Sequence, residues 1–215
     1  MPITPEEFES SDGVGDWRVL GRGACARFRT GSFAVGVQLV EAVGALADAA
    51  DRRPDVDLRP DAVVVRLPLG LDVPVSDPRD VELARQISAA ARELDLPADP
   101  AGVQDVDLTV DALSHHRVLP FWRAVLGYEQ VGEEGLLDAD RRSPAIRFQP
   151  MSGPRPQRNR MHVDVWVPAD QAEARVAAAL AAGGHLVSDE YAPAWWTLAD
   201  EEGNEVDVAT WRGRD

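Results

Sequence analysis

The chain has 215 residues, enough for one large domain or two small ones, and 45% of them are hydrophobic and 27% charged, as in ordinary globular proteins. Its 22 basic and 37 acidic residues give a net charge of −15, so nucleic acids and acidic membrane surfaces should be repelled. Every basic residue is an arginine, which excludes Schiff-base chemistry on lysine. The single cysteine, Cys25, excludes an intrachain disulfide and thiol-rich metal sites.

The N-terminus carries no sign of a targeting segment. Residues 1–10 are acidic rather than basic, and the sequence contains no run of 18 or more apolar residues. We therefore expect a cytoplasmic protein that binds neither nucleic acid nor a membrane.

The first half predicts a helix, two strands, a helix, a strand and a helix. Thr4, followed by proline and glutamates, marks the start of a short helix. Two short strands are predicted over residues 17–20 and 24–29, and a β-branched strand over 61–67. Apolar residues at steps of three and four predict helices over 33–50 and 80–94.

Prolines and glycine between residues 95 and 102 forbid a continuous helix, so a domain boundary is predicted there. The first domain then covers residues 1–98, a linker covers 99–103, and the second domain covers 104–215.

The second domain contains an internal repeat, over residues 104–151 and 159–211. In each unit an alternating strand precedes a helix that ends at glycine; the first helix runs through Phe121, Trp122 and Val125, and the second through Val176 and Leu180. Three strand-like runs follow each helix, at 129–133, 135–138 and 145–151, then at 185–191, 194–199 and 205–211. Two βαβββ units predict an α+β fold in which a curved sheet carries helices on its convex side and leaves a concave cup open.

Because side chains alternate along a strand, the polar residues of both units are predicted to share the concave face, with valines beneath the helices. The inward-facing set is His162, Asp164 and Trp166; Asp105, Asp107 and Thr109; Arg147 and Gln149; Glu205 and Asp207; and an aromatic wall that includes Trp195. Apolar walls with a few convergent polar groups are typical of a small-molecule site.

Two stretches of the second domain, Pro120 to Tyr128 (PFWRAVLGY) and Leu198 to Asp207 (LADEEGNEVD), resemble the vicinal-oxygen-chelate superfamily of glyoxalase-like proteins. The resemblance places metal-ligand positions at Asp105, Arg147, His162 and Asp207. Arg147 departs from the pattern, because a guanidinium cannot ligate a cation. We therefore expect no cofactor, and leave a divalent metal on Asp105, His162 and Asp207 as the alternative.

Residues 16–97 resemble pterin carbinolamine dehydratase, in GSF at 31–33, ADAADRRPD at 47–55, VVVRL at 63–67 and DVELA at 80–84. The resemblance implies an α/β sandwich. The family's His-His-Pro motif is replaced by Arg52-Arg53-Pro54, and no histidine precedes His115, so proton exchange by the family's mechanism is not expected. Arg52 and Arg53 either belong to a solvated turn or bind an anionic ligand, and Asp80 is predicted as a helix N-cap.

Both resemblances imply non-redox chemistry, so the leading hypothesis is a tailoring enzyme, a dehydratase or isomerase, that acts on a cyclic or aromatic small molecule. His162 would move a proton, Asp207 or Asp105 would orient it, and Arg147 would stabilise negative charge on oxygen. The residues predicted to contact the substrate are Trp166, Trp195, Trp196, Asp164 and Gln149, with Arg52 and Arg53 in the first domain.

Two other functions stay open: a binding or resistance protein that holds the molecule without converting it, and a retained 4a-hydroxytetrahydropterin dehydratase. A homo-oligomer is expected, because both domains leave edge strands to pair.

Overall fold

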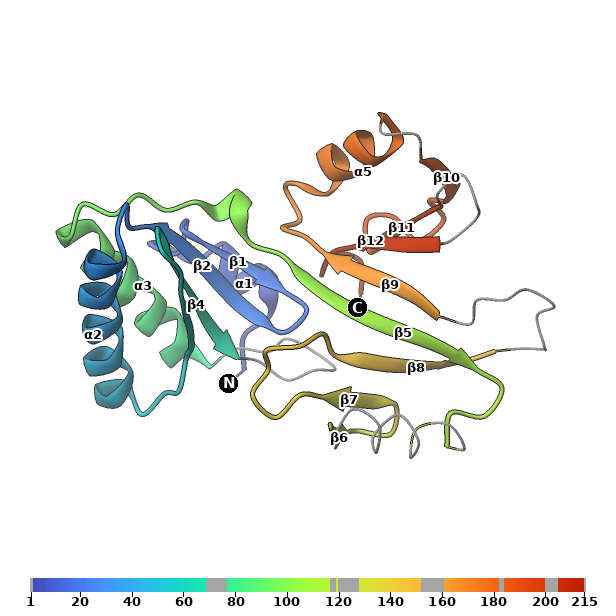
Figure 1. Ribbon diagram of the computed structural model, residues 1–215, viewed down its shortest axis with the longest axis horizontal. Helices are drawn as coiled ribbons and strands as arrows, with labels where there is room; N and C mark the ends of the chain where they lie inside the picture. The colour runs from blue at the N-terminus through green and yellow to red at the C-terminus, as the bar shows by residue number, and fades with distance from the viewer. Residues whose placement is uncertain are drawn as a thin grey trace. The chain divides into compact units, whose positions relative to one another are not determined.

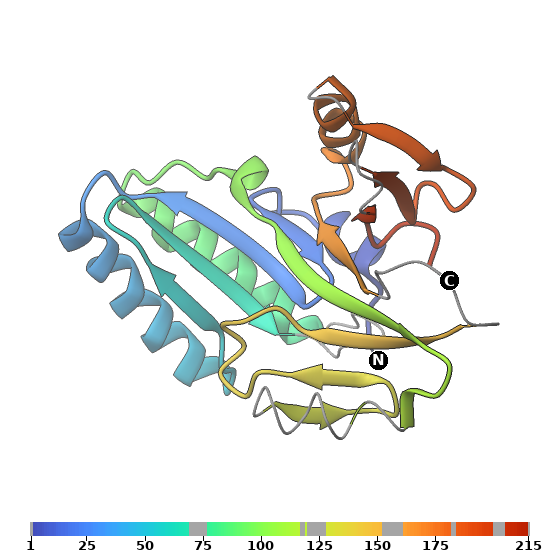
Figure 2. The same cartoon turned by 45° about the vertical axis from the view of Figure 1, so that its right-hand side comes forward.

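The computed structural model describes residues 2–68, 77–116, 119, 128–151, 161–181, 184–199 and 205–214. The fold is mixed α+β, as predicted, and divides into two compact units, Met1–Val103 and Gln104–Asp215 (Figures 1 and 2).

The first unit holds one antiparallel sheet of four strands in the order β1-β2-β4-β3. Its elements are α1 (Pro5–Glu9), β1 (Trp17–Leu20), β2 (Gly23–Arg29), α2 (Phe33–Ala50), β3 (Asp55–Leu58), β4 (Ala62–Pro68), α3 (Pro78–Glu93) and a 3₁₀ turn at Pro100–Gly102. Helices α2 and α3 pack on each other and cover one face of the sheet (Figures 1 and 2). The buried Trp17 ties β1 to α3, because its indole Nε1 donates to the Ala84 carbonyl at 3.2 Å and to the Ser88 hydroxyl at 3.1 Å.

Strand β3 was not among the elements predicted from the sequence. Its four residues pair antiparallel with β4, from Asp55 opposite Arg66 to Leu58 opposite Val63. An edge strand has only one neighbouring strand and buries few side chains, so a polar sequence is tolerated there.

Helix α3 begins two residues earlier than predicted. Asp77, not Asp80, is the N-cap: its side chain accepts from the Arg79 amide at 2.9 Å. Asp80 is the third helical residue and accepts from the Asp77 amide at 2.8 Å, which completes a capping box.

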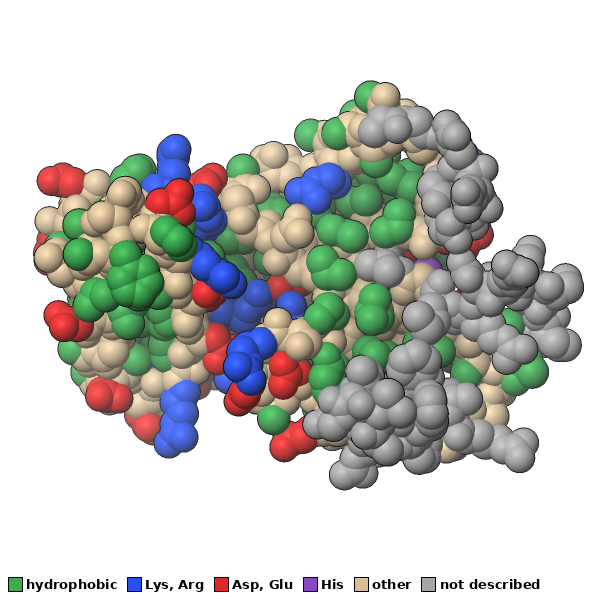
Figure 3. All heavy atoms as spheres, in the orientation of Figure 1, with side chains coloured by type: hydrophobic (Ala, Val, Ile, Leu, Met, Phe, Trp, Pro, Cys, Tyr) green, Lys and Arg blue, Asp and Glu red, His purple; other side chains and the backbone are tan. Residues whose placement is uncertain are grey.

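Among the described helices, α2 has a length and apolar composition that could span a membrane. Leu39, Val43 and Ala47 pack inward, whereas Phe33 and Val37 are exposed. Figure 3 shows hydrophobic side chains gathered over this helix.

The second unit holds one sheet of eight strands in the order β10-β11-β12-β9-β5-β8-β7-β6. The strands are β5 (Asp105–Ala112), β6 (Glu129–Val131), β7 (Gly135–Leu137), β8 (Ile146–Pro150), β9 (Met161–Trp166), β10 (His185–Ser188), β11 (Trp195–Ala199) and β12 (Glu205–Ala209), with helix α5 (Ala172–Ala181). The central strands β5 and β9 pair antiparallel, and from them the two halves run outward in the same relative order. The strands of the two halves thus follow one another in matching order across the sheet. The first-unit helix predicted through Phe121, Trp122 and Val125 lies outside the described residues.

Helix α5 packs on one face of this sheet. Its residues Ala172 and Val176 form a core with Val167, Leu198 and Val208, and Val165, Val206 and Trp196 pack against that core. Since side chains alternate along strands, the neighbours of these residues in β9, β11 and β12 point to the opposite face. We call that opposite face the site face.

Candidate functional site

Three rows of side chains cross the central strands on the site face, set by the pairing register. The first row, the aromatic row, runs Trp195, Ala209, Trp166, Asp105; the second, the acidic row, runs Thr197, Asp207, Asp164, Asp107; the third runs His162, Thr109, Arg147. Neighbouring strands lie about 4.8 Å apart and successive rows about 7 Å apart, because rows are two residues apart along each strand. Side chains from adjacent rows can therefore meet.

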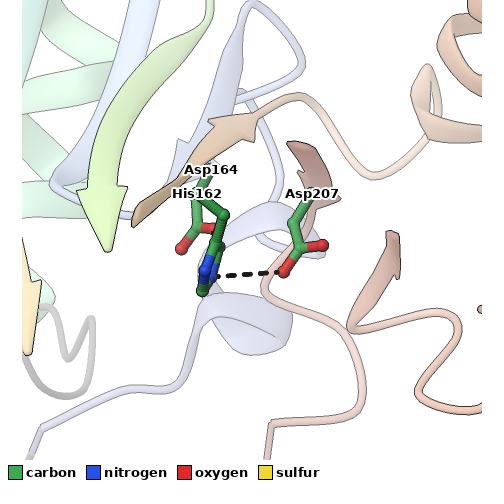
Figure 4. A group of neighbouring side chains, drawn as sticks. All are labelled: His162, Asp164 and Asp207. Atoms are coloured by element: carbon green, nitrogen blue, oxygen red, sulfur yellow. Dashed lines mark ion pairs between the residues drawn. The ribbon is translucent and has the colours of Figure 1, made fainter. Parts of the chain in front are cut away.

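His162 meets two carboxylates of the acidic row. Its Nε2 lies 3.4 Å from Oδ1 of Asp164 and 3.7 Å from Oδ2 of Asp207. Figure 4 shows the three side chains converging from β9 and β12. All three are largely buried, with 14–17% of each side chain exposed. We call His162, Asp164 and Asp207 the His-Asp-Asp group.

The two carboxyls of this group are poorly compensated. Loss of hydration on burial is the main cause that raises the pKa of Asp164; Asp207 also raises it, whereas His162 and a hydrogen bond from Thr109 lower it. Burial likewise raises the pKa of Asp207, against the lowering effects of a Thr197 hydrogen bond and of His162. Both acids are therefore held in a setting that favours a proton or another cation beside them.

A divalent cation fits this group. One ligand atom from each of the three residues lies within 4.8 Å of the others. Oδ1 of Asp164 is buried without a hydrogen-bond partner, while Oδ2 accepts from Thr109 Oγ1 at 3.1 Å. An imidazole nitrogen with two carboxylate oxygens is a donor set that zinc and related metals accept. Asp164 thus takes the place predicted for Asp105.

Asp105 faces the same side of the sheet but stands apart from the His-Asp-Asp group. It pairs with Trp166, whereas His162 pairs with Thr109, four residues further along β5 and so about 13 Å away. Its side chain is buried, with the residue only 1% exposed. The prediction that Asp105 orients His162 is therefore wrong on register, although its face was predicted correctly.

Arg147 and Gln149 lie on the site face, on strand β8, and both are exposed. Arg147 pairs with Thr109 in the third row, and Gln149 pairs with Asp111 one row further on. Thr109 stands between His162 and Arg147, so these two residues lie two strands apart, about 10 Å backbone to backbone.

The three predicted tryptophans divide between the two faces. Trp166 and Trp195 belong to the aromatic row, and Trp195 stacks on Tyr191 with ring centroids 4.4 Å apart. Trp196 packs against the core beneath α5, on the other face. Its prediction as a substrate contact is wrong, because adjacent residues in a strand point to opposite faces.

Arg214 belongs to the site and was missed from the sequence. Its guanidinium carbon lies 4.2 Å from the ring centroid of Trp166 and 5.3 Å from that of Trp195. It follows the last strand in an irregular tail, where no periodicity assigns a direction to a side chain. The available signal was chemical: an acidic face that carries indole rings favours an arginine from nearby sequence.

Arg52 and Arg53 do not form a paired anion site. Arg52 Nε lies 2.8 Å from Asp80 Oδ1, and its terminal nitrogen lies 2.8 Å from Asp77 Oδ2. Arg53 is exposed. Arg52 therefore neutralises the acidic start of α3, which corrects both predictions made for it: a solvated turn and an anionic-ligand contact.

A family model matches most of the second unit. Residues 107–209 match the family model described as glyoxalase-like domain. A solved structure, a glyoxalase/bleomycin resistance protein/dioxygenase superfamily member from Vibrio splendidus 12B01, aligns at 15% identity and a TM-score of 0.33, over 50% of this chain and 99% of the other. A search of curated proteins returned no match. Residues 107–209 thus form a glyoxalase-like domain.

Proposed function

We propose that the glyoxalase-like domain binds a small cyclic or aromatic molecule on its site face and moves a proton in a non-redox reaction, such as dehydration, cyclisation or isomerisation. The observation that carries this proposal is the position of His162 Nε2 between two buried carboxylates at 3.4 and 3.7 Å. Histidine is the side chain whose ordinary pKa allows proton exchange near neutral pH.

His162 is the proton carrier in this proposal. As it takes a proton from the substrate, Asp164 and Asp207 stabilise the imidazolium that forms, because both carboxylates lack full compensation before the transfer. The two distances exceed a normal hydrogen bond, and contacts of this kind commonly tighten only when substrate is bound.

Arg147 is the proposed partner for negative charge. It lies on the same face and in the same row as His162, and Thr109 on strand β5 stands between them. A substrate between the two would have its proton at His162 and its developing oxyanion at the guanidinium. Trp166 and Trp195 supply the apolar surface for a ring in the adjacent row.

A second candidate is metal-assisted chemistry at the same group, and it is favoured by the buried Oδ1 of Asp164, which accepts no hydrogen bond from the described residues. His162, Asp164 and Asp207 would hold a divalent cation, which would polarise a substrate oxygen when bound. Adding Mn²⁺ or Zn²⁺ should then raise the unfolding temperature of the wild type, and Asp164→Asn should abolish that rise. An equal rise in both proteins would contradict metal binding at this group.

The direct experiment incubates the protein in D₂O with a panel of aromatic compounds that carry an enolisable or β-hydroxy carbonyl. Mass spectrometry then measures deuterium uptake and loss of one water. We expect at least one compound to exchange or dehydrate with the wild type and to lose this reaction in His162→Ala. A compound that binds but never exchanges or dehydrates would support the alternative of a binding or resistance protein.

A retained pterin dehydratase activity would lie in the first unit, independent of His162. Arg52, at the position of the family's catalytic motif, forms ion pairs with Asp77 and Asp80. A carbinolamine dehydration assay on Arg52→Met tests this function separately. We expect the wild type and the variant to be equally inactive.

A further inference from the structure

The aromatic row of the site face forms a distinct subsite. Trp166 and Trp195 stand on either side of Ala209, two strands apart, and the residue between them has only a methyl side chain. Tyr191 stacks on Trp195 with an interplanar angle of 14°. We call Trp166, Trp195 and Tyr191, with Ala209 as the floor, the aromatic subsite.

A positive charge already lies on this subsite. The Arg214 guanidinium is within 6 Å of both indole centroids, at 4.2 Å from Trp166 and 5.3 Å from Trp195. That range is the one in which a cation is attracted to the face of an aromatic ring. Trp166 is only 8% exposed, whereas Arg214 remains an exposed residue.

The acidic row lies next to the aromatic subsite and favours a cation there. Loss of hydration on burial lowers the pKa of Arg214, and Arg147 lowers it further, whereas the charges of Asp164, Asp207 and Asp107 act in the other direction and stabilise the cation. Three acidic side chains against one basic side chain would repel a carboxylate or phosphate from the same place.

Residues 210–214, which follow strand β12 and carry Arg214, are held in place by hydrogen bonds. The Thr210 hydroxyl donates to the Pro193 carbonyl at 2.6 Å and accepts from the Arg212 amide at 3.2 Å. Gly213 has a φ of +71°, a conformation that glycine adopts without strain, and it turns the chain back. Arg214 Nε then donates to the Thr210 carbonyl at 2.9 Å, so the rest of the guanidinium is left for the indoles.

We propose that the aromatic subsite recognises a positively charged group of the ligand, a guanidinium or an ammonium, and that Arg214 occupies the subsite as a tethered stand-in until the ligand displaces it. This inference rests on the proposed function, because it names the class of small molecule that the same face binds. A tethered competitor lowers the apparent affinity by the fraction of molecules in which it occupies the site.

The test compares three probes of similar size and different charge: benzylguanidinium, benzyl alcohol and benzoate. Binding is measured by tryptophan fluorescence and calorimetry on the full chain. Arg214→Ala should bind benzylguanidinium at least about tenfold more tightly than the wild type, because the competitor is gone. Trp166→Ala in the Arg214→Ala background should lose that gain.

Arg212→Ala is the matched control. Arg212 is in the same tail, with its guanidinium 5.7 Å from the Trp211 centroid and away from the aromatic subsite. Its removal should leave benzylguanidinium binding unchanged. Repeating the titration in His162→Ala separates the two proposals, since cation binding should survive there even if no proton transfer is ever found.

Two results would overturn the inference. If Arg214→Ala binds benzylguanidinium no more tightly than the wild type, Arg214 is no competitor. If the wild type binds benzoate and Arg214→Ala loses it, Arg214 is an anion-binding residue.

Discussion

Each unit of this protein carries a buried or half-buried group of charged side chains, and the two groups differ in how well their charges are balanced. In the first unit Arg52 lies 2.8 Å from carboxylate oxygens of both Asp77 and Asp80. In the second, His162 approaches Asp164 and Asp207 only to 3.4 and 3.7 Å. The same two-carboxylate pattern is thus paired with a permanent cation in one unit and with a titratable base in the other.

The pKa directions follow from that difference. Hydrogen bonds from Arg79 and Arg52 lower the pKa of Asp77, whereas burial raises the pKa values of Asp164 and Asp207. A balanced group stabilises the fold, and an unbalanced one is retained at a cost in stability, as is common at functional sites. We therefore expect Arg52, Asp77 and Asp80, here called the Arg52 group, to stabilise the fold, and we propose the His-Asp-Asp group as the functional one.

The largest expected effect is on turnover. Once the deuterium assay has identified a reactive compound, His162→Ala should lower its rate by at least about 10²-fold, the low end for general acid or base catalysis. Arg52→Met should leave the rate unchanged. Equal losses in the two variants would contradict the division of roles between the units.

The next effect is on the stability of the first unit. Arg52→Met should lower the free energy of unfolding by roughly 1–3 kcal/mol, because the buried Asp80 carboxylate loses its partner. Urea unfolding measures the change. Arg53→Met is the matched control: its side chain is exposed, so its effect should stay within about 0.5 kcal/mol. Similar losses in both variants would show that the Arg52 ion pairs contribute nothing specific.

A smaller effect of opposite sign is expected in the second unit. Asp164→Asn should raise the free energy of unfolding at neutral pH by on the order of 1 kcal/mol, because it removes a desolvated charge and keeps an acceptor for Thr109. Asp138→Asn should act in the other direction, because Asp138 accepts from the amides of Asp140, Arg142 and Ser143 and its pKa is lowered. A loss of stability in Asp164→Asn would contradict the unbalanced charge.

The gain in Asp164→Asn should depend on pH. With its folded-state pKa above the ordinary 3.8, Asp164 binds a proton more tightly in the folded chain, so its penalty is absent below pH 3.8 and grows as pH rises through the folded pKa. The difference in unfolding free energy between variant and wild type should therefore be near zero at pH 3.5 and largest at neutral pH. A gain that is constant across this range would indicate a cause other than the charge.

Much of the fold could be predicted from the periodicity of apolar residues. The elements that were missed or misplaced have physical reasons. The helix over 33–50 was predicted with the observed bounds from its apolar spacing, and in the structure Ser32 caps its start. Strand β3 was missed because an edge strand needs no apolar run, and α3 was started late because both Asp77 and Asp80 can cap a helix.

For the site, the alternation of side chains along a strand predicts which face a residue lies on, and no more. Parity placed His162, Asp164 and Asp207 on one face, but it does not give the register between strands, so Asp105 was assigned to His162 although it pairs with Trp166. Trp196 was assigned without a parity argument and proved to face the α5 core. Arg214 lies beyond the last strand, where its position depends on the turn at Gly213.

The two carboxyls beside His162 carry the proposed function, and their titration tests it directly. A ¹³C NMR titration of the aspartate carboxyl carbons should give midpoints above 3.8 for Asp164 and Asp207, and below 3.8 for Asp138 as an internal reference. Midpoints at or below 3.8 for Asp164 and Asp207 would mean that their charges are compensated, and would make the His-Asp-Asp group structural like the Arg52 group.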